Sequence, residues 1–222
     1  MKLNQDYVKR LKELEGIKFG EYFIWDKKIC YLPDSSKGVL YENITRIDFI
    51  SLYSYLQIEL FNEGLIDVKW KDDIERVEWF LKNRGDLKLL SPNEYQQWKI
   101  HCNSLYMKIK SPYVVEYVDM FYNDLLEKYG DLIIYNDVDS LYLNIDKVSF
   151  QTKEWISELK DFNYDTQFIN YFYIEERKRY IEQEESGTVN AKGFRDKVKK
   201  DNLLNIIKRE IRRRKLDNLG IE

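Results

Sequence analysis

The spacing of apolar residues divides the chain into short strands and longer helices. Spacings of three and four residues, read with helix start and stop signals, predict helices over 4–15, 52–61, 72–83, 91–107, 112–128, 153–160 and 201–216. Alternating or short apolar runs predict a hairpin over 18–33 and strands over 44–50, 131–136, 141–146, 167–183 and 187–192. Strand pairs joined by short turns favour antiparallel neighbours. We therefore expect an α+β fold with an antiparallel sheet.

Helix start and stop signals fix several of these boundaries. Ser91-Pro92 followed by Glu94 is a capping-box signature, and Ser111-Pro112 repeats the serine–proline start. Gly130 is a stop signal for the helix that Ser111-Pro112 begins. The last helix is expected to carry one apolar face and most of its arginines on the opposite face. That apolar face consists of Leu203, Leu204, Ile207 and Ile211.

Composition excludes several classes of protein. The 222 residues are 44% apolar, as in a globular domain, and no apolar run is long enough to span a bilayer. Cys30 and Cys102 give no disulfide framework, so we expect a cytoplasmic protein. His101 is the only histidine, which argues against zinc sites built on several histidines and against a Ser-His hydrolase. The sequence also lacks P-loop and GxGxxG motifs.

Charge is distributed unevenly along the chain. The whole sequence has a net charge of −3, but the segment 192–215 holds eleven basic and three acidic residues. A basic C-terminal arm on an acidic body suits a polyanionic partner, although a solvated helix face is an equally simple reading.

Two carboxylates lie one residue apart at a predicted hairpin tip. Asp137 and Asp139 separate two apolar strands, and like charges held so close together favour a bound cation. A calcium loop of the EF-hand type is excluded, because Leu141 and Tyr142 occupy positions that need an oxygen ligand and a glycine. A solvated hairpin tip and a DxD sugar-nucleotide site remain open.

A third carboxylate, Asp48, ends the strand 44–50 just before a predicted helix. A carboxylate here can hold a divalent cation, and the N–H groups of the helix start can hold a phosphate. The alternative is an ordinary turn or cap residue. Further along, Lys99, Asn103 and Tyr106 share one face of the 91–107 helix, which suits a triphosphate, a sugar and a base, or simply an amphipathic helix.

Taken in order, five segments resemble the motifs of family B DNA polymerases over roughly residues 40–200. Asp48–Tyr53 resembles their motif A, DxxSLYPS, and Lys99–Tyr106 resembles motif B, KxxxNSxYG. Tyr135–Ser140 resembles motif C, YxDTDS, and Lys178–Tyr180 resembles the KxY motif. Asn190–Arg195 is similar to the stretch that leads into the thumb. The resemblance implies a polymerase palm with short helical fingers and a reduced thumb.

The resemblance also implies a division of the chain into five segments. These are an N-terminal helix and hairpin (1–43), a palm with motif A (44–70), fingers with motif B (71–110), a palm with motif C and KxY (111–183), and a basic thumb or C-terminal arm (184–222). About 40 residues precede motif A, so we expect no proofreading exonuclease domain.

The implied reaction is template-directed addition of deoxynucleotides to a primer 3′-hydroxyl by two Mg²⁺ or Mn²⁺ ions. Catalytic carboxylates are Asp48, Asp137 and Asp139, which hold the metals together with the backbone carbonyl of Phe49. One metal activates the 3′-hydroxyl and the other neutralises the leaving pyrophosphate. The implied nucleotide-binding residues are Ser51, Leu52, Tyr53, Lys99, Asn103 and Tyr106. The implied DNA-binding residues are Lys178, Tyr180, Lys192 and Arg195.

Implied partners are primer–template DNA, a deoxynucleoside triphosphate, and a terminal protein or a separate exonuclease or replication subunit. We expect no membrane association, and a viral or mobile-element origin with residence in the host cytoplasm. The sequence departs from the family motifs at Ser54, Tyr55, Met107 and Val138. These departures leave room for a catalytically weak or inactive DNA-binding module. A different nucleotidyl or glycosyl transferase is a third reading, which leaves Lys99, Asn103 and Lys178 unexplained.

Overall fold

The computed structural model describes residues 2–14, 31–109, 111–137, 139–152, 159, 162–176 and 178–218. Its Cα atoms form two compact units. We call Met1–Ile29, Phe49–Lys128 and Glu154–Tyr164 the helical unit. We call Cys30–Asp48, Tyr129–Lys153 and Asp165–Glu222 the sheet unit.

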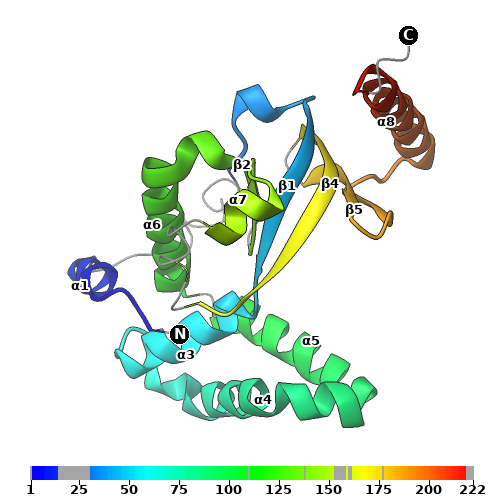
Figure 1. Ribbon diagram of the computed structural model, residues 1–222. Coiled ribbons are helices and arrows are strands. Elements are labelled where there is room, and N and C mark those ends of the chain that lie inside the picture. The colour runs from blue at the N-terminus through cyan, green and yellow to red at the C-terminus, as the bar shows by residue number, and fades with distance from the viewer. Residues whose placement is uncertain are drawn as a thin grey trace. The chain divides into compact units, whose positions relative to one another are not determined.

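Six strands form one sheet in the order β2-β3-β1-β4-β5-β6 (Figure 1). Their bounds are β1 (Leu40–Phe49), β2 (Ile133–Asp137), β3 (Ser140–Leu143), β4 (Tyr164–Glu176), β5 (Arg179–Glu184) and β6 (Val189–Lys192). At the start of β1, Gly38 N–H donates to the Ile174 carbonyl at 2.8 Å, and just past its end Ile50 N–H donates to the Asn163 carbonyl at 2.8 Å. These bonds join opposite ends of β1 and β4, so that pair is antiparallel, like the others. The predicted α+β fold with an antiparallel sheet is confirmed.

Register places three polar residues in one row across the sheet. Asp48 of β1 lies opposite Ser140 of β3, and Ser140 lies opposite Asp137 of β2. Asp139 is in the turn that joins β2 to β3, where its N–H donates to the Asp137 carbonyl at 2.6 Å. The predicted hairpin tip is therefore confirmed, and the strand that ends at Asp48 runs alongside it.

Aromatic side chains form the core of the sheet unit. Tyr142 and Phe172 stack with ring centroids 4.4 Å apart, and Tyr180 and Tyr135 lie 5.5 Å and 5.6 Å from Tyr142. All four are at most 1% exposed. Strand neighbours place Tyr135, Tyr142 and Arg46 side by side, because Tyr142 pairs with both of the others.

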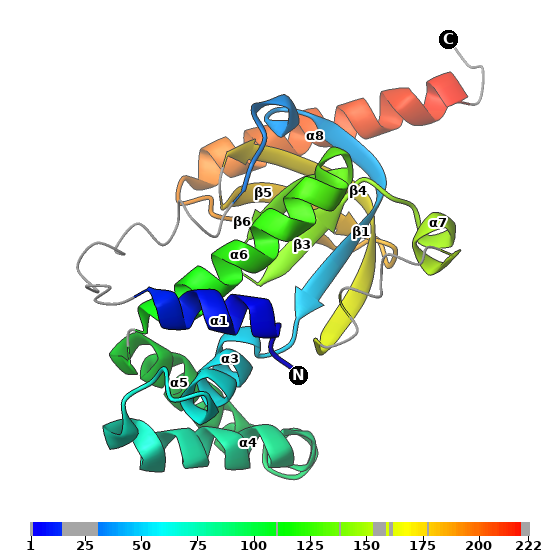
Figure 2. The ribbon, with the colours of Figure 1, turned by 90° about the vertical axis from the view of Figure 1, so that its left-hand side faces the viewer.

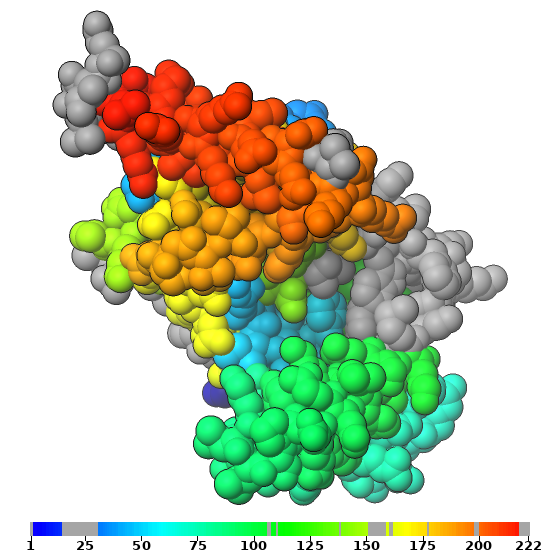
Figure 3. Space-filling view, turned by 90° about the vertical axis from the view of Figure 1, so that its right-hand side faces the viewer, coloured from blue at the N-terminus to red at the C-terminus, as the bar shows by residue number. Residues whose placement is uncertain are grey.

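Helix α8 (Lys197–Asn218) packs on this sheet by the apolar face that the sequence predicted (Figure 2). Ile207 is 6% exposed and shares an apolar cluster with Leu40 and Ile181. In Figure 3 the side chains of α8 lie against those of β5 and β6. Arg214 differs from the exposed arginines of this helix, because its side chain is partly buried. It donates to the Leu40 carbonyl at 3.2 Å and to Glu42 at 2.9 Å.

The helical unit contains most of the remaining helices in the described part of the chain. They are α1 (Gln5–Glu13), α3 (Leu52–Asn62), α4 (Lys71–Leu90), α5 (Pro92–Ile109) and α6 (Pro112–Tyr129), whose last residue belongs to the sheet unit. Helix α4 is longer than the predicted 72–83. It continues through Gly85 because Leu87 packs against the cluster that α4 forms with α3 and α5, and it stops where Ser91-Pro92 begins α5.

Other boundaries differ slightly from the predictions. Strand β2 starts at Ile133, because a 3₁₀ turn, Gly130–Leu132, follows α6. A short helix, α7 (Lys147–Thr152), precedes the predicted 153–160 helix. That predicted helix and the predicted 18–33 hairpin fall almost entirely outside the described residues. Among the helices in the described ranges, none is long and apolar enough to cross a bilayer.

Candidate functional site

The predicted catalytic carboxylates meet at one end of the sheet unit. The sequence separates Asp48 from the 137–139 turn by about ninety positions, yet Ser140 Oγ donates to Asp48 Oδ1 at 2.5 Å. Asp48 is the last residue but one of β1 and keeps its side chain 32% exposed. The sheet register therefore places Asp48, Asp137 and the turn that contains Asp139 at the same end of three neighbouring strands.

The second oxygen of Asp48 is held by Arg46, which the sequence analysis did not single out. Arg46 Nε lies 2.8 Å from Asp48 Oδ2, and Nη2 lies 2.7 Å from the same oxygen. Residues two apart on a strand share a face, so β1 places this guanidinium beside the carboxylate. This ion pair offsets part of the negative charge of Asp48.

Arg46 also reaches a buried carboxylate on β5. Its Nη1 lies 2.6 Å from Glu182 Oε1, and Tyr142 donates to Glu182 Oε2 at 3.3 Å. Glu182 is 1% exposed and Arg46 is 8% exposed, so this is a buried ion pair whose charges are satisfied by each other. Burial opposes the charge on Arg46, but Tyr142, Glu182 and Asp48 outweigh it and hold the Arg46 pKa above its ordinary value.

The surroundings of Asp139 disfavour its charged form. Its pKa is raised, first because neighbouring protein atoms displace water from the carboxylate, and then because Asp48 and Asp137 repel its charge. Lys192 and the turn N–H oppose part of this shift. A raised pKa in a group of carboxylates is typical of sites that take a cation.

Oxygen ligands of this kind suit Mg²⁺ or Mn²⁺, and Asp48, Asp137 and Asp139 would be the ligands. In the described part of the chain, however, no three acidic, histidine or cysteine side chains are gathered in metal-binding geometry. The donor chemistry fits the ion, while the metal-free arrangement has Asp48 engaged by Arg46 instead.

The predicted DNA-binding residues Tyr180 and Lys192 lie opposite each other on β5 and β6. Lys192 Nζ stands 5.3 Å from the centroid of the Tyr180 ring. Burial opposes the charge on Lys192, but contact with the Tyr180 hydroxyl and the field of Glu182 raise its pKa. The charge of Lys192 in turn lowers the pKa of Asp139, so the ammonium group lies within electrostatic range of that carboxylate.

Lys178 is fixed by its backbone rather than by its side chain. Its N–H donates to the Tyr135 hydroxyl at 2.9 Å, and it adopts a left-handed conformation with φ of 59°. Gly193 packs so closely on the Lys178 carbonyl that a Cβ atom at 193 would overlap it. Strand β2, the Lys178–Tyr180 segment and the segment that begins at Gly193 are therefore held together, with the Lys178 and Arg195 side chains exposed to solvent.

In the helical unit, Ser51 begins α3 with φ of 54°, a left-handed conformation that is uncommon without glycine. Its Oγ accepts from Arg84 Nη1 of α4 at 2.9 Å. Arg84 and Lys88, one helical turn apart, line a hollow of about 490 Å³. Aromatic residues close the other sides of this hollow. The full lining is Ile50, Tyr55, Arg84, Gly85, Lys88, Phe162, Asn163 and Tyr164.

The other predicted nucleotide-binding residues also belong to the helical unit. Lys99 and Asn103 lie one turn apart on α5 with exposed side chains, as the spacing predicted. Tyr53 is partly exposed, whereas Leu52 is 3% exposed and offers only its backbone to a ligand. The side chain of Tyr106 lies outside the described part of the chain.

Phe49, the predicted carbonyl ligand, anchors the start of the helical unit. Its ring is 3% exposed and packs edge-on against Phe121 and Phe162, with centroids 5.6 Å away in each case. This packing fixes the backbone that follows Asp48, so the Phe49 carbonyl is presented by a rigid segment.

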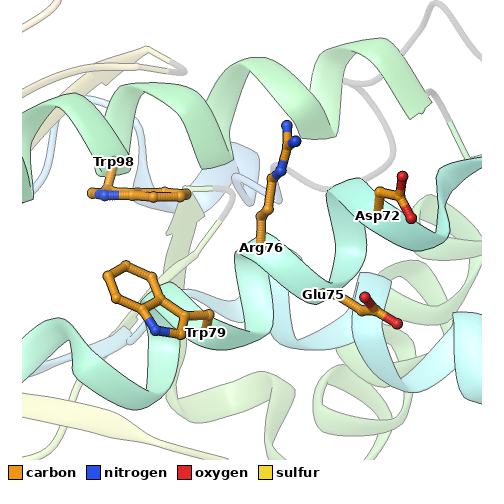
Figure 4. Close-up of a pocket in the computed structure, with 5 residues that line it drawn as sticks. All are labelled: Asp72, Glu75, Arg76, Trp79 and Trp98. Atoms are coloured by element: carbon orange, nitrogen blue, oxygen red, sulfur yellow. The ribbon is translucent and has the colours of Figure 1, made fainter.

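A second hollow, of about 440 Å³, lies between α4 and α5 (Figure 4). Trp79 and Trp98 contact each other there with centroids 5.2 Å apart, and Asp72, Glu75 and Arg76 complete the lining. Carboxylates predominate over the one arginine, so this hollow is less suited to phosphate than the Arg84 hollow is.

Sequence reasoning missed Arg46, Glu182, Arg84 and Lys88. Arg46 carried a usable signal, because a charged residue alternates with Asp48 on an otherwise apolar strand. Arg84 and Lys88 form a basic pair at helical spacing just before motif B. Glu182 gave no signal, because its burial depends on strands that are distant in sequence.

No model of a known protein family matches the chain, and no curated protein matches it. Among solved structures, the chain is weakly similar to the family B DNA polymerase from the hyperthermophilic archaeon Pyrobaculum calidifontis, with a TM-score of 0.45 and 16% sequence identity. The similarity covers 71% of this chain and 28% of that one, so the chain spans little more than a quarter of the polymerase. At this level of similarity, activity has to be argued from the residues of the chain itself.

Proposed function

We propose that this protein is a template-directed DNA polymerase that extends a primer 3′-hydroxyl by metal-dependent nucleotidyl transfer. The observation that carries the proposal is the row of Asp48, Ser140 and Asp137 across β1, β3 and β2. In this proposal Asp48, Asp137 and Asp139, which come from two segments distant in sequence, act together at this end of the sheet, with Lys192 within electrostatic range of Asp139.

In this proposal Asp48, Asp137 and Asp139 hold divalent cations, which supply Lewis-acid activation of the primer hydroxyl and neutralisation of phosphate charge. Ser140 orients Asp48 through the hydrogen bond to Oδ1. A bound cation would offset the repulsion that Asp48 and Asp137 exert on Asp139.

In this proposal, residues of the helical unit bind the triphosphate of the incoming nucleotide. The N–H groups at the start of α3 and the Arg84 guanidinium next to Ser51 form an anion-binding pair, because a helix start and a basic side chain both favour negative charge. Lys88 and Lys99 add positive charge, and Tyr53 and Asn103 serve the sugar and base.

In this proposal, the sheet unit binds duplex DNA. Lys178, Lys192 and Arg195 come from adjoining segments that Tyr135 and Gly193 hold together. Helix α8 adds exposed basic side chains, so binding to phosphates should be strongly dependent on salt.

Primer extension on a defined template tests the proposal directly. The wild type should add nucleotides with Mg²⁺ or Mn²⁺, and Asp48→Asn should reduce the rate by at least a hundredfold while DNA binding persists, since a metal contributes several kcal/mol to the transition state. Asp34→Asn, an exposed carboxylate on the same unit, is the matched control. Failure of the wild type to extend DNA, RNA or protein primers, despite binding DNA, would contradict the proposal.

One observation favours a second function, a non-catalytic DNA-binding or replication-partner module. The described carboxylates are not gathered in metal-binding geometry, and Arg46 occupies Asp48. Such a module would bind DNA equally well with and without divalent cations. Cation-dependent binding of a deoxynucleoside triphosphate, lost in Asp139→Asn, separates the polymerase from this module.

A further inference from the structure

The pair Arg46 and Glu182 lies outside every motif, yet it touches the proposed metal site. Arg46 donates twice to Asp48 Oδ2, from Nε at 2.8 Å and from Nη2 at 2.7 Å, and its third contact is Glu182 at 2.6 Å. Asp48 Oδ1 accepts one bond, from Ser140. A carboxylate oxygen has two lone-pair sites, so Oδ1 keeps one for a ligand while both sites of Oδ2 are occupied.

Burial explains why Arg46 stays in place. Glu182 is 1% exposed, and a buried carboxylate without a partner is very unfavourable, so Glu182 anchors the guanidinium. Tyr142 donates to the other oxygen of Glu182 and completes its hydrogen bonding. Asp48 is the outermost member of this chain of contacts, with its side chain 32% exposed.

From these contacts we infer that Arg46, which Glu182 holds in place, is the internal counter-ion of Asp48. We infer that Arg46 thereby sets how tightly a divalent cation binds at the proposed site of Asp48, Asp137 and Asp139. Arg46 fixes Oδ2 and leaves Oδ1 for the cation. Its positive charge weakens cation binding, and the negative charge of Glu182 restores part of it. Arg46 is a positioning residue, because it acts on the cation through Asp48. The inference rests on the proposed function for the identity of the site.

The charges predict opposite effects of two charge-removing substitutions on Mn²⁺ affinity. Arg46→Gln removes a positive charge near the ion, so the dissociation constant should fall about three- to tenfold. Glu182→Gln removes a negative charge and leaves Asp48 as the ionic partner of Arg46. The dissociation constant for Mn²⁺ should therefore rise about threefold. The dissociation constant of the double variant should lie within about threefold of the wild type, because the two charge changes offset each other.

Electron paramagnetic resonance of Mn²⁺ titrated into each purified full-length variant measures these constants without any need for activity. Asp48→Asn identifies the fraction of binding that belongs to the site. Glu185→Gln is the matched control, since Glu185 is exposed and pairs with Lys147 at 3.5 Å. Arg46→Gln leaves the buried Glu182 carboxylate without its cationic partner, so thermal melting is used to check that this variant folds. Arg46→Lys keeps the charge and should keep the Mn²⁺ affinity within about twofold while losing the double contact.

The outcomes separate the inference from the proposed function. Opposite shifts in the two single variants support the inference, whether or not primers are extended. Equal or unchanged Mn²⁺ affinity in both folded single variants overturns it, even if the wild type extends primers. Absence of Asp48-dependent Mn²⁺ binding in every variant overturns both. Primer extension that fails while the opposite shifts persist overturns the proposed function alone.

Discussion

Asp48 and Ser140 lie directly opposite each other on β1 and β3, and the Ser140 hydroxyl donates to Asp48 Oδ1 at 2.5 Å. This bond ties the end of one strand to the first residue after the Asp137–Asp139 turn. The position of Asp48 beside this turn depends on the sheet register, because a shift of one residue would turn Asp48 to the other face of the sheet. The proposed chemistry therefore depends on how three strands pair.

Asp139→Asn should abolish primer extension and also stabilise the metal-free protein. The pKa of Asp139 is raised in the folded chain, so its charged form is disfavoured by folding at pH 7. Below the ordinary pKa of 3.8 both states are protonated and the penalty disappears. Because Asp139 is exposed and solvent screens its charge, we expect thermal melting to show a gain of only about 1 °C at pH 7 that vanishes near pH 3. An equal gain at both pH values would assign it to packing instead.

Arg195→Ala should weaken DNA binding and reduce its dependence on salt. Arg195 is exposed in the segment that Gly193 fixes against Lys178. If Arg195 contacts one phosphate, the slope of log K against log salt should fall by about one. Fluorescence anisotropy over a salt series measures the slope, with Lys37→Ala, whose partner is Asp34, as the control. Equal slopes for Arg195→Ala and the wild type would remove Arg195 from the interface.

Gly193→Ala should be far more damaging than Gly187→Ala. Both glycines have positive φ, 77° and 84°, so both substitutions carry the same backbone strain. A Cβ at 187 meets open space, whereas at 193 it overlaps the Lys178 carbonyl. Urea denaturation should show a loss of about 1 kcal/mol for Gly187→Ala and at least about 2 kcal/mol more for Gly193→Ala. Similar losses would mean that the Lys178 turn moves aside easily.

Neighbouring isoleucines on α8 provide a test of its docking on the sheet. Ile207 is 6% exposed and Ile206 is 60% exposed, so truncation should cost about 2–4 kcal/mol at 207 and less than about 0.5 kcal/mol at 206. Chemical denaturation of the two alanine variants measures the difference. Equal, small losses would show that α8 is not held against the sheet in solution.

Cys102 should react slowly with thiol reagents in the folded protein. Burial raises the pKa of this thiol to about 11, and its side chain is 3% exposed within the cluster of α3, α4 and α5. In a Cys30→Ser background, modification should proceed only as fast as the helices open, and urea should accelerate it strongly. Rapid modification at pH 7 without denaturant would contradict the burial of Cys102.

Local patterns in the sequence determined most individual elements. The alternation around Asp137 and Asp139 predicted the β2–β3 turn, and the spacing of Leu203, Ile207 and Ile211 predicted the buried face of α8. These predictions succeeded because periodicity and turn chemistry depend on neighbours in the chain. The end of α4 was misplaced because tertiary packing of Leu87 extends that helix through Gly85.

Only the tertiary structure decided how the site is held. It inserts β3 between β1 and β2, which brings Asp48 to the turn, and it joins Arg46 to Glu182 across 136 positions of sequence. It also presses Gly193 on the Lys178 carbonyl. The sequence holds no local signal for these contacts, because the partner of a buried charge is chosen by strand order and register. Those are set by the collective burial of the sheet core rather than by any single segment.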